Sequence, residues 1–118
     1  MSYVDGYVLA VETNNKQAYK AMAEEMAVVF KEHGAISVVE TWGDDVPDGE
    51  VTSLPMAVKC KEDETVVFSW IIWPSKEARD NGWKTAMEDQ RMKDYTPESM
   101  PFDGKRMIFG GFETIVDS

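Results

Sequence analysis

Residues Thr65–Trp73 read Thr-Val-Val-Phe-Ser-Trp-Ile-Ile-Trp, and Pro74 and Ser75 close the run. This composition predicts a β-strand, in which successive side chains point to opposite sides of the sheet. Both sides are apolar; one carries Val66, Phe68, Trp70 and Ile72, and the other carries Val67, Ser69, Ile71 and Trp73. Such a strand is typical of a sheet that is covered on both faces.

Only two segments have the apolar spacing of helices. The first follows Thr13, Asn14 and Asn15, which predict an N-cap, and Gly34 predicts its end. The second begins after Ser75 and runs to about Met92, with a stripe of small residues at Ala78, Gly82 and Ala86. This stripe predicts close packing on the sheet, and it gives Gly82 a packing reason. Two helices can cover only one face of a small sheet.

The remaining strands are predicted at Tyr3–Glu12, Ala35–Trp42, Pro55–Lys61 and Arg106–Val116. Pro55–Lys61 and Thr65–Trp73 flank Glu62-Asp63-Glu64, which is the layout of a hairpin. Residues 93–105 form a long loop in which Asp103-Gly104 is an ordinary turn signal. In the first strand the small residues suit the approach of a helix, so the side with Tyr3, Asp5 and Tyr7 is expected to face away from the helices.

The order strand, helix, two or three antiparallel strands, helix, strand best fits a ferredoxin-like α+β fold, βαββαβ, with both helices on one face of an antiparallel sheet. Residues 1–118 contain no repeat, low-complexity tract or linker, which predicts a single domain. The other face of the sheet would then expose large aromatic side chains, drawn from Tyr7, Trp42, Trp70 or Trp73, and Phe109. Three such rings leave roughly 500 Å² uncovered, which predicts a homodimer that pairs the two sheets face to face.

Composition narrows the classes of partner. The 118 residues are 43% hydrophobic and 29% charged, as in soluble globular proteins, and the formal net charge is −10. That charge opposes binding to nucleic acid and to anionic membranes. No apolar run approaches the ~20 residues of a membrane span. Residues 1–12 do not resemble a signal peptide, so a cytoplasmic location is expected.

Few residues suit a metal or cofactor. Cys60 is the only cysteine and is expected to pack in a strand, and His33 is the only histidine. For His33 a structural or capping role at the end of the first helix is favoured over proton transfer. The acidic loop with Asp44, Asp45 and Asp48 does not match a calcium-loop pattern and is expected to be solvated. No metal site and no cofactor are therefore predicted.

Five short motifs together resemble the YbaA-like bacterial proteins, a family without an assigned function in the dimeric α/β-barrel superfamily. They are Tyr3-Val4-Asp5-Gly6, Lys31-Glu32-His33-Gly34-Ala35, Gly43-Asp44-Asp45-Val46-Pro47, Glu64-Thr65-Val66-Val67-Phe68-Ser69-Trp70 and Met100-Pro101-Phe102-Asp103-Gly104-Lys105-Arg106-Met107. The resemblance implies a ferredoxin-like protomer and a dimer whose two sheets form a barrel. Monooxygenases and haem-degrading enzymes of that superfamily often carry a histidine or asparagine on the helix after the central strand, where this chain offers Asn81.

Three functions stay open. The first is a homodimeric protein that binds a small organic molecule in a barrel cavity between the two sheets, with Tyr7, Trp42, Trp70 and Phe109 as ligand-binding candidates. The second is a cofactor-independent monooxygenase or isomerase acting on a small aromatic or quinone-like compound, for which the catalytic candidates are Asp5, Glu40 and His33. Asp5 and Glu40 have a structural alternative, which is pairing with Arg79, Lys105 or Arg106. The third is a structural or interaction protein with a filled barrel.

Overall fold

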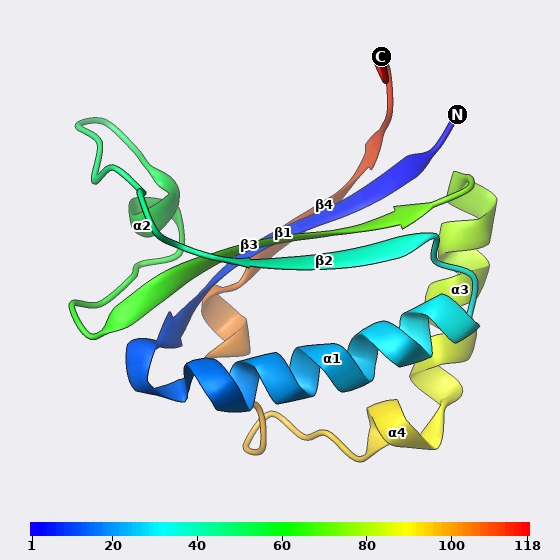
Figure 1. Ribbon diagram of the computed structural model, residues 1–118, viewed down its shortest axis with the longest axis horizontal. Coiled ribbons are helices and arrows are strands. Elements are labelled where there is room, and N and C mark those ends of the chain that lie inside the picture. The colour runs from blue at the N-terminus through cyan, green and yellow to red at the C-terminus, as the bar shows by residue number, and fades with distance from the viewer.

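The computed structural model describes all residues 1–118, and its main elements are shown in Figure 1. Four strands form one antiparallel sheet in the order β2-β3-β1-β4. In chain order the elements are β1 (Tyr3–Glu12), η1 (Thr13–Asn15), α1 (Lys16–Glu32), β2 (Ser37–Trp42), α2 (Leu54–Ala57), β3 (Glu64–Trp73), α3 (Lys76–Glu88), α4 (Gln90–Lys93), η2 (Gly104–Arg106) and β4 (Ile108–Glu113). The predicted ferredoxin-like α+β architecture is confirmed.

The predicted central strand lies inside the sheet, where β3 pairs with β1 along its whole length and with β2 on its other side. One side of β3 faces α1 and α3, and its residues Val67, Ser69, Ile71 and Trp73 are at most 1% exposed. In Figure 1 α1, α3 and α4 all lie on this side of the sheet, which we call the helix face. The main hydrophobic clusters therefore form between the helices and this face.

Gly82 brings α3 close to the sheet, as the small-residue stripe predicted. A Cβ built at this position would overlap the ring of Trp73 and lie 2.9 Å from the carbonyl oxygen of His33. Glycine lowers helix stability by roughly 1 kcal/mol relative to alanine, and here the close approach explains its use. Gly82 and Ala86 are both buried.

The predicted strand over residues 55–61 is wrong. The segment forms the short helix α2, because the Ser53 hydroxyl accepts a hydrogen bond from the Met56 amide and Pro55 lies in the first turn, where its missing N–H is not needed. A residue with positive φ, Lys59, then reverses the chain. The antiparallel partner of β3 on this side is β2, with Val38 opposite Ile71.

Several further boundaries differ from the predictions. The second helix ends at Glu88, because Asp89 is extended and caps a separate turn, α4, through the Arg91 amide. Residues 13–15 form a 3₁₀ turn with no side-chain cap bond to α1. The last strand covers Ile108–Glu113 and is shorter than predicted.

The prediction for the two sides of β1 is also wrong. Asp5, Tyr7, Leu9 and Val11 lie on the helix face, as their pairing with Ile71, Ser69, Val67 and Thr65 shows. The polar atoms of Asp5 and Tyr7 find hydrogen-bond partners there, so burial carries no penalty for an unpaired group. The small residues Val8 and Ala10 instead pack under Val58, next to α2, which Figure 1 shows on the opposite side of the sheet.

We call this opposite side the outer face. Residues of the α2 segment cover only one end of it, where they pack on Val66 of β3. Elsewhere it carries exposed apolar side chains: Phe68 is 48% exposed, Ile108 43% and Phe112 59%. The protomer therefore leaves a large apolar surface uncovered on this side.

Candidate functional site

A cavity of about 570 Å³ lies between the helix face of the sheet and the helices. Its walls come from all four strands, from α1, α3 and α4, and from the loop after α4, and 16 of the 22 lining residues are hydrophobic. Six of the eight methionines in the chain line it, namely Met22, Met26, Met87, Met92, Met100 and Met107. Flexible thioether side chains give such walls an adaptable shape.

Glu40 is the centre of a polar cluster in the wall of this cavity. It lies on β2, and its carboxylate accepts hydrogen bonds from Tyr7 of β1 (2.6 Å), Tyr19 of α1 (2.7 Å) and Ser69 of β3. Alternation along the strands aims Tyr7, Glu40 and Ser69 at the same face, since they are direct partners in the sheet register. A carboxylate that accepts from three hydroxyls and donates to none acts as an acceptor only.

The two tyrosines of this cluster are donors and not bases. Burial, followed by the negative charge of Glu40, raises the pKa of Tyr7 and of Tyr19 far above the ordinary value for tyrosine. Both hydroxyls therefore keep their protons at neutral pH. Because each hydroxyl donates its one proton to Glu40, both are suited to hold Glu40 in place and to accept a hydrogen bond from a bound molecule.

Asp5 forms a second cluster in the same cavity, and it is 7% exposed. One carboxylate oxygen accepts from the indole N–H groups of Trp73 (2.9 Å) and Trp83 (2.8 Å). The other oxygen accepts from two guanidinium nitrogens of Arg79, at 3.0 and 2.9 Å. The pairing of Asp5 with Arg79 was one of the predicted alternatives. Because all of these donors are fixed, Asp5 has little capacity left to act as a base.

His33 does not reach the cavity. It is the C-cap residue of α1, and its ring bonds to Thr85 (2.8 Å) and to Asp89 (3.2 Å), which ties α1 to α3 and the start of α4. Asn81 is an exposed residue of α3 and does not line the cavity either.

The predicted ligand-binding residues are split between the two faces of the sheet. Tyr7 and Phe109 are direct partners in the register of β1 and β4, and both line the cavity. Trp42 is on the helix face but does not line the cavity. It packs beside the hydrophobic cluster that contains Leu9, and the ammonium of Lys16 lies over its ring at 5.5 Å from the centroid. Trp70 is on the outer face next to Phe68. The structure thus brings together only two of the four.

Other cavity residues were not singled out as binding residues from the sequence. Phe102 lies in the loop before η2 and meets the ring of Tyr19 edge to face at 5.9 Å. Loop residues have no periodicity, so the only signal for Phe102 was its place in the motif at residues 100–107. Tyr19, Met22 and Met26 had the spacing of a helix core, which does not separate core filling from cavity lining.

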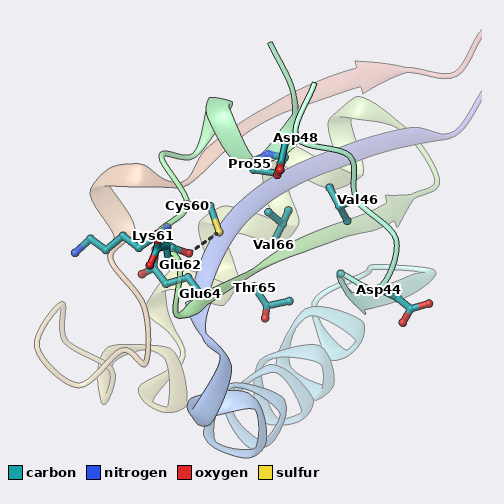
Figure 2. Close-up of a pocket in the computed structure, with 11 residues that line it drawn as sticks. Asp44, Val46, Asp48, Pro55, Cys60, Lys61, Glu62, Glu64, Thr65 and Val66 are labelled. Atoms are coloured by element: carbon teal, nitrogen blue, oxygen red, sulfur yellow. Dashed lines mark hydrogen bonds between the residues drawn. The ribbon is translucent and has the colours of Figure 1, made fainter. Parts of the chain in front are cut away.

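A second hollow of about 400 Å³ lies on the outer face beside β3, and Figure 2 shows its residues. Cys60 lies there and packs on the cluster under α2, as a packing residue would; burial raises the pKa of its thiol. The side chains of Asp44 and Asp48 lie at different places around the rim (Figure 2). No three His, Cys, Asp or Glu side chains gather closely enough to hold a metal ion.

One rim of this hollow is held by an ion pair. Arg106 of η2 makes two hydrogen bonds to Glu64 of β3, at 2.8 and 2.7 Å, and it also bonds the Lys59 carbonyl oxygen. Asp103 caps η2 and also accepts a hydrogen bond from the guanidinium of Arg106. The Asp103-Gly104 turn therefore attaches the start of β4 to β3 and to the end of the α2 segment.

None of the helices combines the length and the apolar character needed to cross a lipid bilayer.

Solved structures with low sequence identity share the fold. The Mycobacterium tuberculosis protein Rv0793 superimposes with a TM-score of 0.60 at 11% identity, covering 100% of this chain and 99% of that one. SnoaB, a cofactor-independent oxygenase from Streptomyces nogalater, gives a TM-score of 0.61 at 9% identity, covering 98% and 95%. A NIPSNAP family protein from Agrobacterium tumefaciens gives 0.56 at 14%, covering 96% and 92%. At these identities the likeness concerns the fold alone.

Other proteins have much higher sequence identity to this chain. The uncharacterized protein YbaA of Escherichia coli K12 is 59% identical over 117 residues, which is 99% of each chain, and the YbaA protein of Shigella flexneri matches equally. Residues 2–104 match a family described as protein of unknown function (DUF1428). The resemblance to YbaA-like proteins is confirmed, and the chain belongs to the DUF1428 family.

Proposed function

We propose that this protein binds a small organic molecule in the cavity between the helix face and the helices. The observation that carries the proposal is the cavity itself, about 570 Å³ with mostly apolar walls and the Glu40 cluster set into one side. Ligand sites typically measure about 300 to 1,000 Å³ and combine apolar walls with a few polar groups. A protein with a packed interior would leave no such volume.

The proposed site differs from the one expected between two sheets. Tyr7 and Phe109, which were predicted to contact the ligand, line a cavity within one protomer. The ligand would therefore be enclosed by a single chain. A second subunit is then needed to cover the outer face and not to form the cavity walls.

We infer that the protein is a homodimer that pairs through the outer faces. The support is the set of exposed apolar side chains Phe68, Ile108 and Phe112, beside the half-buried Trp70, on a face that α2 covers at one end only. Light scattering at micromolar concentration should give twice the mass of one chain for the wild-type protein. The Phe68→Glu variant should give the mass of a single chain. A monomeric wild-type protein would contradict the dimer.

The single unpaired cysteine supports a cytoplasmic location.

The cavity can be tested by filling it. Ala23 is buried on α1 and lines the cavity, whereas Ala21 on the same helix is exposed. Ala23→Leu should weaken binding of the apolar dye N-phenyl-1-naphthylamine about ten-fold or more, and Ala21→Leu should leave it unchanged. Equal binding by both variants would show that the dye does not enter the cavity. Native mass spectrometry of freshly purified protein would report the subunit count and any retained molecule together.

A second function has support from one observation. Glu40 lines the cavity, and its carboxylate could take a proton from a bound aromatic or quinone-like compound in a cofactor-independent oxygenation or isomerisation. SnoaB, which shares the fold, is described as a cofactor-independent oxygenase. For an enzyme, Glu40→Gln should abolish turnover of such a compound with its affinity kept, whereas a binding protein shows no turnover in the wild type.

A further inference from the structure

The charges in the cavity are unbalanced. Four charged residues line it, of which Asp5, Glu40 and Asp80 are acidic and only Arg79 is basic. The guanidinium of Arg79 is committed to Asp5 and Asp80. Glu40 makes no ion pair and is held only by neutral hydroxyl groups. The partly buried carboxylate of Glu40 therefore has no cationic side chain as a partner.

Glu40 also has an acceptor position that is not used. A carboxylate offers about four lone-pair positions. Oε1 accepts from Tyr19 and Ser69, and Oε2 accepts from Tyr7 alone. One position on Oε2 therefore remains for a donor supplied by a bound molecule. A charged N–H donor forms the stronger type of bond with a carboxylate.

The walls around Glu40 suit a cation with an apolar body. The rings of Tyr7, Tyr19 and Phe102 line the cavity together with the methionines. Aromatic faces attract a desolvated ammonium group through the quadrupole of the ring. The net charge of −10 also raises the local concentration of cations around the molecule. An anionic ligand meets repulsion from the same groups.

We propose that the cavity selects an apolar organic cation, such as an aromatic or alicyclic amine that is protonated at neutral pH, with its ammonium group against Oε2 of Glu40. This inference rests on the proposed binding function and adds the chemical class of the ligand. It assigns Glu40 as the residue that determines specificity and leaves Asp5 with Arg79 as a fixed part of the wall.

Three flat tricyclic probes of similar shape test the charge preference. Near neutral pH, 9-aminoacridine is a cation, acridine is neutral and 9-anthracenecarboxylate is an anion. Isothermal titration with the wild-type protein should give the tightest binding for 9-aminoacridine, by about ten-fold or more over acridine, and the weakest for the anion. Equal affinities, or a preference for the anion, would overturn the inference and leave cavity binding intact. Failure of all three probes to bind would instead overturn the proposed function.

Two variants with the same loss of charge locate the effect. Glu40→Gln should remove most of the preference for 9-aminoacridine while the affinity for acridine stays within about two-fold. Asp63→Asn removes one negative charge from an exposed residue and should leave the preference unchanged. Equal losses in the two variants would show that the cation binds through the overall charge, which overturns the role of Glu40. If Glu40→Gln does not fold, Ala23→Leu serves instead, and 9-aminoacridine binding that persists in it contradicts the inference.

Discussion

Asp5 and Glu40 are two carboxylates on neighbouring walls of one cavity, and their surroundings differ in kind. Asp5 is held by an arginine and two indoles, all of which can only donate. Glu40 is held by three hydroxyls, each of which can donate or accept. The first arrangement includes a cationic partner, whereas the second has only neutral partners, whose hydroxyl groups can reorient. The difference separates a structural carboxylate from one that is available to a ligand.

The largest effect is expected from Asp5→Asn. The new amide keeps one oxygen and replaces the other with an NH2 group, so either the two indole N–H groups or the Arg79 guanidinium would face a donor in place of their acceptor. Removing one partner of a buried charged pair typically costs about 3–5 kcal/mol of folding free energy. Urea unfolding followed by circular dichroism measures it. A loss of unfolding free energy below about 1 kcal/mol would mean that the Asp5 cluster contributes little to the stability of the fold.

Gly82→Ala should disturb the same cluster indirectly, by displacing the ring of Trp73. The added methyl group would overlap the Trp73 ring, whose indole N–H is bonded to Asp5, and displacement of that ring costs about 2–3 kcal/mol. Gly104→Ala is the matched control, because nothing lies within 4 Å of a Cβ at that position. If both variants unfold at the same urea concentration, the close approach of α3 to the sheet is not as tight as described.

Glu64 adds a third type of carboxylate, paired with an arginine but with no indole. Hydrogen bonds from Arg106 are the main cause that lowers the pKa of Glu64 from 4.5 to about 2. Since the folded-state pKa is depressed, the stabilisation is complete above pH 4.5 and is lost as the pH falls towards about 2. Its size is on the order of 2 kcal/mol.

Glu64→Gln should therefore flatten the fall in unfolding free energy between about pH 4.5 and 2. The exposed Asp63→Asn variant is the control and should keep the slope of the wild type. Unchanged acid sensitivity in Glu64→Gln would show that the ion pair with Arg106 does not contribute to stability at neutral pH.

The smallest effect on stability is expected from Glu40→Gln. The hydroxyls of Tyr7, Tyr19 and Ser69 can rotate to accept from the new amide, so the loss should stay within about 1 kcal/mol. Thermal and urea unfolding of this variant and of Asp5→Asn, side by side, give the comparison directly. A loss as large as that of Asp5→Asn would remove the distinction between the two carboxylates.

The sequence predicted the parts of the fold that depend on apolar runs and on helical spacing. The continuous apolar run of residues 65–73 identified the central strand, and the apolar spacing between residues 15 and 34 identified α1. The order of elements then restricted the topology to the one observed. The motif at residues 100–107 contributed to the family assignment.

Periodicity could not predict which side of β1 faces the helices. From the sequence, Tyr7 and Asp5 have the polarity of surface residues. In the fold, Glu40, Trp73 and Trp83, which are distant in sequence, supply their hydrogen-bond partners. The cavity escaped prediction for the same reason, since it depends on a volume left between elements and on a loop residue, Phe102, without a pattern. The mistaken strand at residues 55–61 followed from its short apolar run, which fits a turn of helix equally well.

The cavity walls come from the first strand, the last strand and nearly every element between them, so the pocket exists only when the whole chain has folded. Any occupant is then linked to global unfolding, and saturation at one hundred times the dissociation constant adds about 2.7 kcal/mol to the unfolding free energy. The melting temperature thus becomes a general reporter of occupancy, and a compound library can be screened for ligands of the proposed site whatever their chemical class.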